Sequence, residues 1–347
     1  MPSYGRIEGY MAKRVGRYTI RFEKAPAIKS YASIAGKKEG EGPLAKEFDE
    51  INTDSTFGEK TWEKAESRLQ NNVLNKALQK ANITPASVDI VFAGDLLNQC
   101  IGTSYGLRES GIPFAGLYGA CSTMAESLSM AAVFVDGGYA NIAAALTSSH
   151  FCTAERQYRC PLEYGGQRPQ SAQWTVTGAG AVILDLNGNG PFIKKITLGR
   201  IVDLGIKDVN NMGAAMAPAA ADTISNYFSD TGAKPGDFDL IATGDLAFVG
   251  SELLKDLLKE QGIELKANYS DCGLMIFDRE KQDVHSGGSG CGCSASVLCS
   301  YILNNLCSGN FKEVLFISTG ALMSPISIQQ GQSIPAVAHL IHISNRP

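Results

Sequence analysis

The segment GACSTMAESLSMAAVFVDGGYANIAAALTSS at residues 119–149 occurs again, in a diverged form, as CGCSASVLCSYILNNLCSGNFKEVLFISTGA at residues 291–321. The two segments align without a gap at a shift of 172 residues, which places Cys121 on Cys293. A repeat is the first feature to look for in a sequence, because it reveals a duplicated structural unit. This repeat therefore indicates that the fold is built from two related halves.

A second repeated segment lies upstream of the first in both halves. TPASVDIVFAGDLL at residues 84–97 aligns with KPGDFDLIATGDLA at residues 234–247 at a shift of 150 residues, and Asp95 falls on Asp245. Two matches in the same order are the pattern that a duplication leaves.

The boundary between the halves is predicted at the turn-rich sequence NGNG. The N-terminal half then covers residues 11–188 and the C-terminal half residues 189–347. Met11 could be a natural start, so residues 1–10 are interpreted as an extension or a remnant of expression.

Each half shows the same succession of helix and strand patterns. In the first half, apolar residues at helical spacing predict a helix at residues 62–81, and buried strands are expected at residues 89–93 and 141–147. A final strand is expected to close each half, at residues 175–186 and 334–343. Strands that alternate with helices form mainly parallel sheets with helices on both faces, which predicts an α/β fold.

The composition is that of a globular protein with a sizeable core, with 44% hydrophobic and 19% charged residues. The net charge of -4 gives no electrostatic footprint for nucleic acid. Nine cysteines without zinc-site spacing predict reduced, mostly buried thiols and no metal site. The N-terminus lacks the apolar region of a secretory signal, and polar residues interrupt the apolar stretch at 114–135, so a soluble chain without a membrane span is expected.

Cys121 is the first candidate functional residue. The turn GACS sets its thiol at the start of a helix, where free backbone N–H groups and the helix dipole favour negative charge. Such a site lowers the pKa of a thiol and also attracts a carboxylate ligand. The alternative is that Cys121 is a small buried apolar residue, as most free cysteines are.

The turn GACS, the strand GAGAVIL and the segments GSGCGCSAS and STGALMS resemble the thiolase and type III ketoacyl-synthase superfamily. The resemblance covers nearly the whole chain from about Gly16. It implies a five-layered αβαβα fold with two pseudo-repeated halves and mainly parallel mixed sheets. It also implies a homodimer, and it puts Cys121 at the position of the nucleophile.

A closer resemblance is to one branch of that superfamily. EGPLAKEFD, SSHFCTAERQYR, NMGAAMAPAAADTI and TGALMSPISIQQ are similar to the stage V sporulation protein AD family. This resemblance implies that the chain binds dipicolinic acid and works with other stage V sporulation A membrane proteins at the spore inner membrane. Dipicolinate would move into the forespore with calcium, and no other cofactor is expected.

The sequence departs from the catalytic pattern of the superfamily. The resemblance to synthases implies a histidine after the strand equivalent to residues 239–243, but this chain reads TGDLAF there. It also implies an asparagine near the position that Cys291 occupies. His339 and His342 lie in the expected last strand and are interpreted as structural. Without a base to activate the thiol, the chain is predicted to bind a ligand rather than to catalyse acyl transfer.

The predicted ligand site gathers polar residues around Cys121. His150 ends a strand at the edge where ligands of such sheets bind, and the second repeated helix start would converge on the first. Arg156, Arg159 and Arg168 lie in a long segment at residues 150–174, which is expected to be functional or to form an interface. The predicted set is Cys121, Asp95, Asn98, Gln99, His150, Arg156, Asp245, Cys291 and Gly292, with Arg159, Arg168 and His285 as further candidates.

Simpler interpretations stand beside these. The two aspartates could cap turns, Asn98 and Gln99 could cap a helix or face solvent, and the arginines could lie on the surface or in a dimer interface. Two other functions also stay open at this point. The chain could be an acyl-thioester condensing enzyme that uses Cys121, or a structural protein that docks on a membrane channel.

Overall fold

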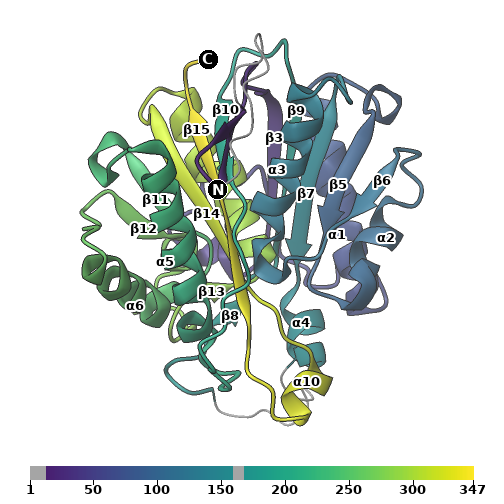
Figure 1. The fold of residues 1–347 in the computed structure, drawn as a ribbon. Coiled ribbons are helices and arrows are strands. Elements are labelled where there is room, and N and C mark those ends of the chain that lie inside the picture. Colours follow the sequence, from purple (N-terminus) through teal and green to yellow (C-terminus); the bar gives the residue numbers. More distant parts are fainter. Residues whose placement is uncertain (1–12, 159–167) are drawn as a thin grey trace.

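The computed structural model describes residues 13–158 and 168–347. The predicted extension at residues 1–10 lies outside the described residues, as do residues 159–167. At the centre of the molecule lies one 13-stranded sheet, and ten of its strands form two five-stranded parts, called the first and second sheets below, that meet along an edge (Figure 1).

The first sheet belongs to the N-terminal half. Its strand order is β3–β9–β7–β5–β6, with antiparallel pairing among the first three strands and parallel pairing among the last three. The strands are β3 (Ala27–Gly36), β9 (Gly178–Asp185), β7 (Ala143–Ser149), β5 (Ile90–Gly94) and β6 (Phe114–Gly116).

The second sheet repeats this plan with the C-terminal half. Its order is β10–β15–β14–β11–β12, again antiparallel first and parallel last. The strands are β10 (Phe192–Thr197), β15 (Ala336–Ser344), β14 (Glu313–Ala321), β11 (Leu240–Thr243) and β12 (Tyr269–Asp271).

The two sheets join where β10 pairs with β3, through Phe192 and Ala27. The short strands β1 (Arg14–Val15), β2 (Thr19–Arg21) and β4 (Glu50–Asn52) complete the 13-stranded sheet. A separate two-stranded sheet consists of β8 (Trp174–Thr175) and β13 (Gly288–Ser289).

Helices cover both outer faces and fill the space between the sheets. On the outside, α1 (Trp62–Lys80) and α2 (Ile101–Leu107) cover the first sheet, and α5 (Met212–Thr231) and α6 (Ala247–Glu260) cover the second. Figure 1 shows these pairs on opposite sides of the molecule. In the middle, α3 (Thr123–Asp136) and α8 (Cys291–Val297) each contact strands of both sheets. The predicted five-layered fold is confirmed.

Small side chains explain why two helices fit between the sheets. Ser127, Ala131 and Ala132 of α3 and Ser294 and Ala295 of α8 are completely buried. Because these residues project little from the helix axis, backbones can approach closely and still pack at interior density. The remaining helices are short: α4 (Phe151–Tyr158), α7 (Cys272–Met275), α9 (Leu303–Cys307), which a π-helical segment (Leu298–Ile302) joins to α8, and α10 (Pro325–Gln329).

The predicted repeat elements are found within a few residues of their expected positions. The helix expected at residues 62–81 is α1, and Thr61 caps its start by accepting a hydrogen bond from Lys64 N. The segment at residues 150–174 is different from a plain loop, because α4 forms at its start and β8 at its end. The side chain of Thr153 on α4 bonds to Glu66 of α1, a long-range contact that sequence periodicity does not report.

Candidate functional site

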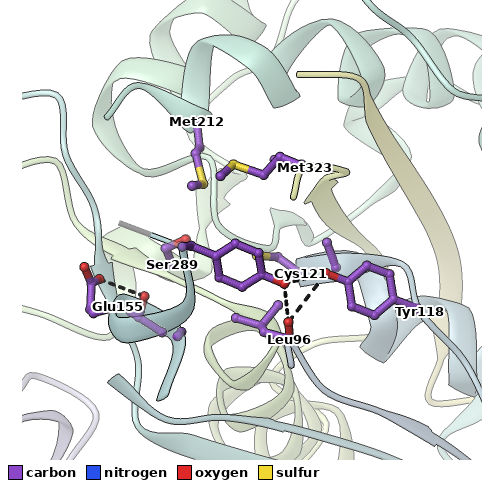
Figure 2. Close-up of a pocket in the computed structure, with 12 residues that line it drawn as sticks. Leu96, Tyr118, Cys121, Glu155, Met212, Ser289 and Met323 are labelled. Atoms are coloured by element: carbon purple, nitrogen blue, oxygen red, sulfur yellow. Dashed lines mark hydrogen bonds between the residues drawn. The ribbon is translucent and has the colours of Figure 1, made fainter. Parts of the chain in front are cut away.

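A small cavity lies where the two repeated helix starts meet. The 3-10 turn Ala120–Ser122, which leads into α3, contacts the start of α8, and Cys121 and Cys291 share one apolar cluster. The two helix starts therefore lie in contact, as expected, but only the first of them lines the cavity. The adjoining cavity has a volume of about 40 Å³, room for about three waters. Its lining comes from both halves (Figure 2): Leu96, Tyr118, Ala120, Cys121, Ala154, Glu155, Tyr158, Thr175, Met212, Ser289, Ala321 and Met323.

Cys121 lines this cavity with only 6% of its surface exposed. Burial raises the pKa of its thiol well above the ordinary value, and the nearby carboxyl group of Asp245 and thiol of Cys291 raise it further. The expectation that the helix start favours the thiolate is therefore wrong. Loss of hydration and a neighbouring negative charge outweigh the helix dipole, because both penalise the charged form directly.

Asp245 is fully buried beside Cys121, at the end of β11. Its Oδ1 accepts from Thr319 Oγ1 at 2.6 Å, and its Oδ2 accepts from Gly290 N at 2.9 Å and from Ser289 Oγ at 3.2 Å. Burial raises the pKa of Asp245, while these hydrogen bonds and one from the Cys121 thiol lower it. The carboxyl group thus ties β14 and the start of α8 to the cysteine.

A second aspartate caps the turn after Asp245 and leaves Asp245 to bond to Cys121, although Asp245 itself does not line the cavity. Asp271, from the neighbouring strand β12, accepts from Leu246 N, Ala247 N and Gly273 N, each at 2.9 Å. These backbone groups follow Asp245 or begin α7, and they would otherwise be buried without a partner. Burial raises the pKa of Asp271 to about 7.

Asp95, the repeat equivalent of Asp245, does not line the cavity. Its Oδ1 accepts from Leu97 N at 2.8 Å, and its Oδ2 accepts from Thr103 N at 2.7 Å. The carboxyl group therefore caps its own turn and the start of α2, which is the simpler of the two interpretations of the sequence.

Cys291 and Gly292 lie beside the cavity but not on its surface. The Cys291 thiol is fully buried and donates to Ser148 O at 2.9 Å. Gly292 N donates to Ser149 Oγ at 3.0 Å, and a Cβ at this position would stand 2.3 Å from Gly178 O. Glycine is needed here for close packing of α8 against the first sheet, and neither residue lines the cavity in which the ligand is expected.

Comparison with known proteins adds to this geometry. Residues 16–344 match the family described as Stage V sporulation protein AD (SpoVAD). The chain is also 47% identical over 327 residues to the Stage V sporulation protein AD of Bacillus subtilis (strain 168), covering 94% of this chain and 96% of that protein. The chain belongs to the stage V sporulation protein AD family.

Solved structures of condensing enzymes share the fold of this family member. The 3-oxoacyl-[acyl-carrier-protein] synthase III of Aquifex aeolicus VF5 is 14% identical, with a TM-score of 0.54 over 91% of this chain and 99% of the synthase. Cerulenin-bound OleA of Xanthomonas campestri is also 14% identical, with a TM-score of 0.58 over 93% of this chain and all of OleA. At such low identity the likeness concerns the fold alone.

None of the four histidines lines the cavity of this family member. His150 turns away from it, since its Nε2 lies 2.7 Å from Ser55 O, and burial lowers its pKa. The expectation that His150 faces the pocket is wrong, because the loop around Ser55 folds over the ring. His285 bonds to Pro169 O, with Nδ1 at 2.9 Å. His339 and His342 lie in β15, as predicted.

Three predicted residues meet elsewhere. Asn98, Gln99 and Arg156 line a separate surface pocket of about 340 Å³ between the start of α2 and α4. Arg156 is paired with Glu63 and lies over the ring of Trp62. These residues were expected around Cys121, but none of them lines its cavity.

The other two arginines have different outcomes. Arg159 lies outside the described residues. Arg168 lies near the cavity without lining it: one Nη is 3.9 Å from Glu155 Oε1, and its guanidinium lies 5.0 Å from the centre of the Trp174 ring. It is thus positioned to offset the charge of a lining carboxylate.

The sequence interpretation missed several lining residues. Tyr118 lies only three positions before Cys121, and Ser289 belongs to the quoted segment GSGCGCSAS, so proximity to those motifs could have suggested both. Tyr158 and Met212 also lie in quoted segments, SSHFCTAERQYR and NMGAAMAPAAADTI, but both are far from Cys121 in the sequence. They reach the cavity from α4 and α5, which pack against it only in the folded chain.

The charged groups at the cavity are acidic rather than basic. Glu155 lines the cavity and Asp245 accepts a hydrogen bond from the lining residue Ser289. Among the described residues, no lysine or arginine lines the cavity. Within those ranges no group of three or more His, Cys, Asp or Glu side chains could hold a metal ion. Calcium therefore stays a prediction that depends on a ligand bringing oxygen atoms of its own.

Proposed function

We propose that this chain acts in sporulation by binding dipicolinic acid, without catalysis, in the cavity beside Cys121. The observation that carries the proposal is the environment of the thiol. Cys121 is buried against the Asp245 carboxyl group, which raises its pKa, and yet it still borders an open space. A condensing enzyme needs the opposite, a thiol made reactive by a neighbouring base.

The replacement of the base supports a loss of catalysis. Asp245 occupies the place after β11 where the resemblance to synthases leads one to expect a histidine, and Cys291 lies near the expected asparagine. Together these two residues cannot donate hydrogen bonds to an oxyanion, because the Cys291 thiol already donates to Ser148 O and Asp245 is an acceptor when ionised.

The walls of the cavity suit a flat ring better than a long chain. Leu96, Ala154 and Ala321 supply apolar surface, and Met212 and Met323 lie above the space (Figure 2). At about 40 Å³ the cavity is smaller than the ~300–1,000 Å³ of usual small-molecule sites, so ligand entry requires side chains to move. Methionine adapts readily because it is unbranched and flexible.

Charge gives calcium a defined place in the proposal. Dipicolinate is a dianion, and Glu155 in the lining would repel it. Calcium bound to the two carboxylates of dipicolinate would cancel that charge and bring oxygen ligands of the kind the ion prefers. This lining therefore favours dipicolinate that carries a bound calcium ion over the free dianion.

The proposal also includes partners. Within the described residues no helix has the length and apolar character to cross a bilayer. Association with the spore inner membrane would then come through other stage V sporulation A membrane proteins, and the chain would act as a homodimer. These partners follow from the family and stay predictions.

Calorimetric titration with dipicolinate, with and without calcium, tests the proposal. We expect saturable binding that exceeds binding of pyridine-2-carboxylate and that weakens roughly tenfold in Cys121→Ala, through lost contact with the ligand. Cys307→Ala is the matched control, because Cys307 is an exposed cysteine on α9. No heat at millimolar ligand would overturn the proposal, and rapid selective alkylation of Cys121 would favour acyl-thioester chemistry instead.

A further inference from the structure

The cavity has few hydrogen-bond donors that a ligand could use. Among the hydroxyl and thiol groups of the described lining, Thr175 Oγ1 donates to Glu155 Oε1 at 3.1 Å and Ser289 Oγ donates to Asp245 at 3.2 Å. The Cys121 thiol is also hydrogen-bonded to Asp245. Each of these donors already serves a buried carboxyl group, so redirecting it to a ligand would remove one of the hydrogen bonds that stabilise that carboxyl group.

Two tyrosines are in a different position. Tyr118 Oη and Tyr158 Oη lie 2.7 Å apart, and both hydroxyl groups converge on the carbonyl oxygen of Leu96. Figure 2 shows the hydroxyl group of Tyr118 directed at this oxygen beside Cys121. Tyr118 comes from the segment just before the cysteine and Tyr158 from the end of α4.

The Leu96 carbonyl has more donors than it needs. Besides both tyrosines it accepts from Gln157 Nε2 at 3.2 Å, while a carbonyl oxygen has two lone pairs. Releasing a tyrosine hydroxyl therefore leaves no buried acceptor without a partner. The pair can turn to a ligand without the penalty that applies to Thr175, Ser289 or Cys121.

The chemistry of the pair suits an anion. A tyrosine hydroxyl donates a hydrogen bond while it is protonated. Burial raises the pKa of Tyr118 to about 12 and raises the pKa of Tyr158 as well. Both side chains thus stay donors over the whole physiological pH range, and two adjacent donors match the two oxygens of one carboxylate.

We infer that Tyr118 and Tyr158 form the carboxylate-recognising pair of the cavity, exchanging the Leu96 carbonyl for a ligand carboxylate when dipicolinate enters. The inference rests on the proposed function, since it names the donors of that same site. It assigns ligand recognition to the tyrosines and leaves Cys121 as part of the wall.

The test compares Tyr118→Phe, Tyr158→Phe and the double variant in dipicolinate titrations. Phenylalanine keeps the ring and removes only the donor. We expect about tenfold weaker binding for each single variant and about a hundredfold for the double variant, from loss of hydrogen bonds to a charged group. Tyr139→Phe is the matched control, because Tyr139 is 78% exposed and lies outside the cavity lining.

A second ligand separates recognition from a structural role. Pyridine-2,6-dicarboxamide has the same shape without the charges, so its affinity should change much less than that of dipicolinate in the same variants. Equal affinity of the wild-type chain and a folded double variant for dipicolinate would overturn the inference and leave the proposed function standing. Parallel loss of both ligands would also overturn it, and a wild-type chain that binds neither would overturn both proposals.

Discussion

The two halves of the molecule use the same Gly-Asp pair in opposite ways. In the first half, Asp95 turns to its own loop, and Thr147 donates to the carbonyl oxygen of Gly94 at 2.6 Å. In the second half, the equivalent threonine, Thr319, donates instead to the carboxyl group of Asp245 at 2.6 Å. One aspartate serves the fold and its counterpart serves the site.

The reason for the difference lies in a neighbouring strand. Asp271 of β12 caps the turn after Asp245, a task that Asp95 performs for itself in the first half. The strand in the corresponding place of the first sheet, β6 (Phe114–Gly116), has no acidic residue. A duplicated unit can therefore release one residue for a ligand site when an added residue takes over its structural role.

The strongest test of this comparison removes the substitute cap. Asp271→Ala should lower the free energy of unfolding by about 3–5 kcal/mol, because three buried N–H groups lose their acceptor. Urea unfolding measures the change. The exposed Asp256 on α6 provides the control, and Asp256→Ala should stay within about 0.5 kcal/mol. A loss for Asp271→Ala no larger than that of the control would contradict the division of roles.

The pH dependence of the free energy of unfolding sharpens the comparison, because it reports on buried carboxyl groups in each half. Burial raises the pKa of Glu39, in the first half, from 4.5 to about 7. The folded chain then holds a proton that the unfolded chain has lost, so stability is greatest below pH 4.5 and falls as the pH rises to about 7. Glu39→Gln should remove up to about 3 kcal/mol of this fall.

The residual slope in Glu39→Gln then includes the contribution of Asp271 in the second half, because burial also raises the pKa of that group to about 7. Chemical unfolding at a series of pH values in the wild-type chain and in Asp271→Asn separates the two contributions. An unchanged profile in Glu39→Gln would show that this carboxyl group is ionised in the folded chain.

The smallest expected effect concerns Cys121. Asp245→Asn should speed alkylation of Cys121 by iodoacetamide about tenfold, because removal of a neighbouring negative charge lowers the pKa of the thiol. Asp95→Asn is the matched substitution in the other half and should leave the rate unchanged. Mass spectrometry of the labelled peptide measures both, and equal rates would mean that Asp245 does not control the thiol.

Much of the fold follows from the sequence because its signals are local. The repeat that aligns Cys121 with Cys293 predicted two halves, and the helical spacing at residues 62–81 predicted α1. The same repeat predicted that the two helix starts lie close together, and Cys121 and Cys291 share one apolar cluster. The predictions for His150, Asp95 and the pKa of Cys121 were less successful, since each depends on neighbours far away in the sequence.

The amino-acid sequence was enough to predict the family, the order of helices and strands, and the position of Cys121 at a helix start. The folded chain was needed to learn that Asp245 bonds to the thiol, that Asp95 caps its own turn, and that the hydroxyl groups of Tyr118 and Tyr158 meet at the cavity. The physical reason is that periodicity and turn residues act along the chain. Burial, charge and hydrogen bonding act through space, between residues that folding brings together.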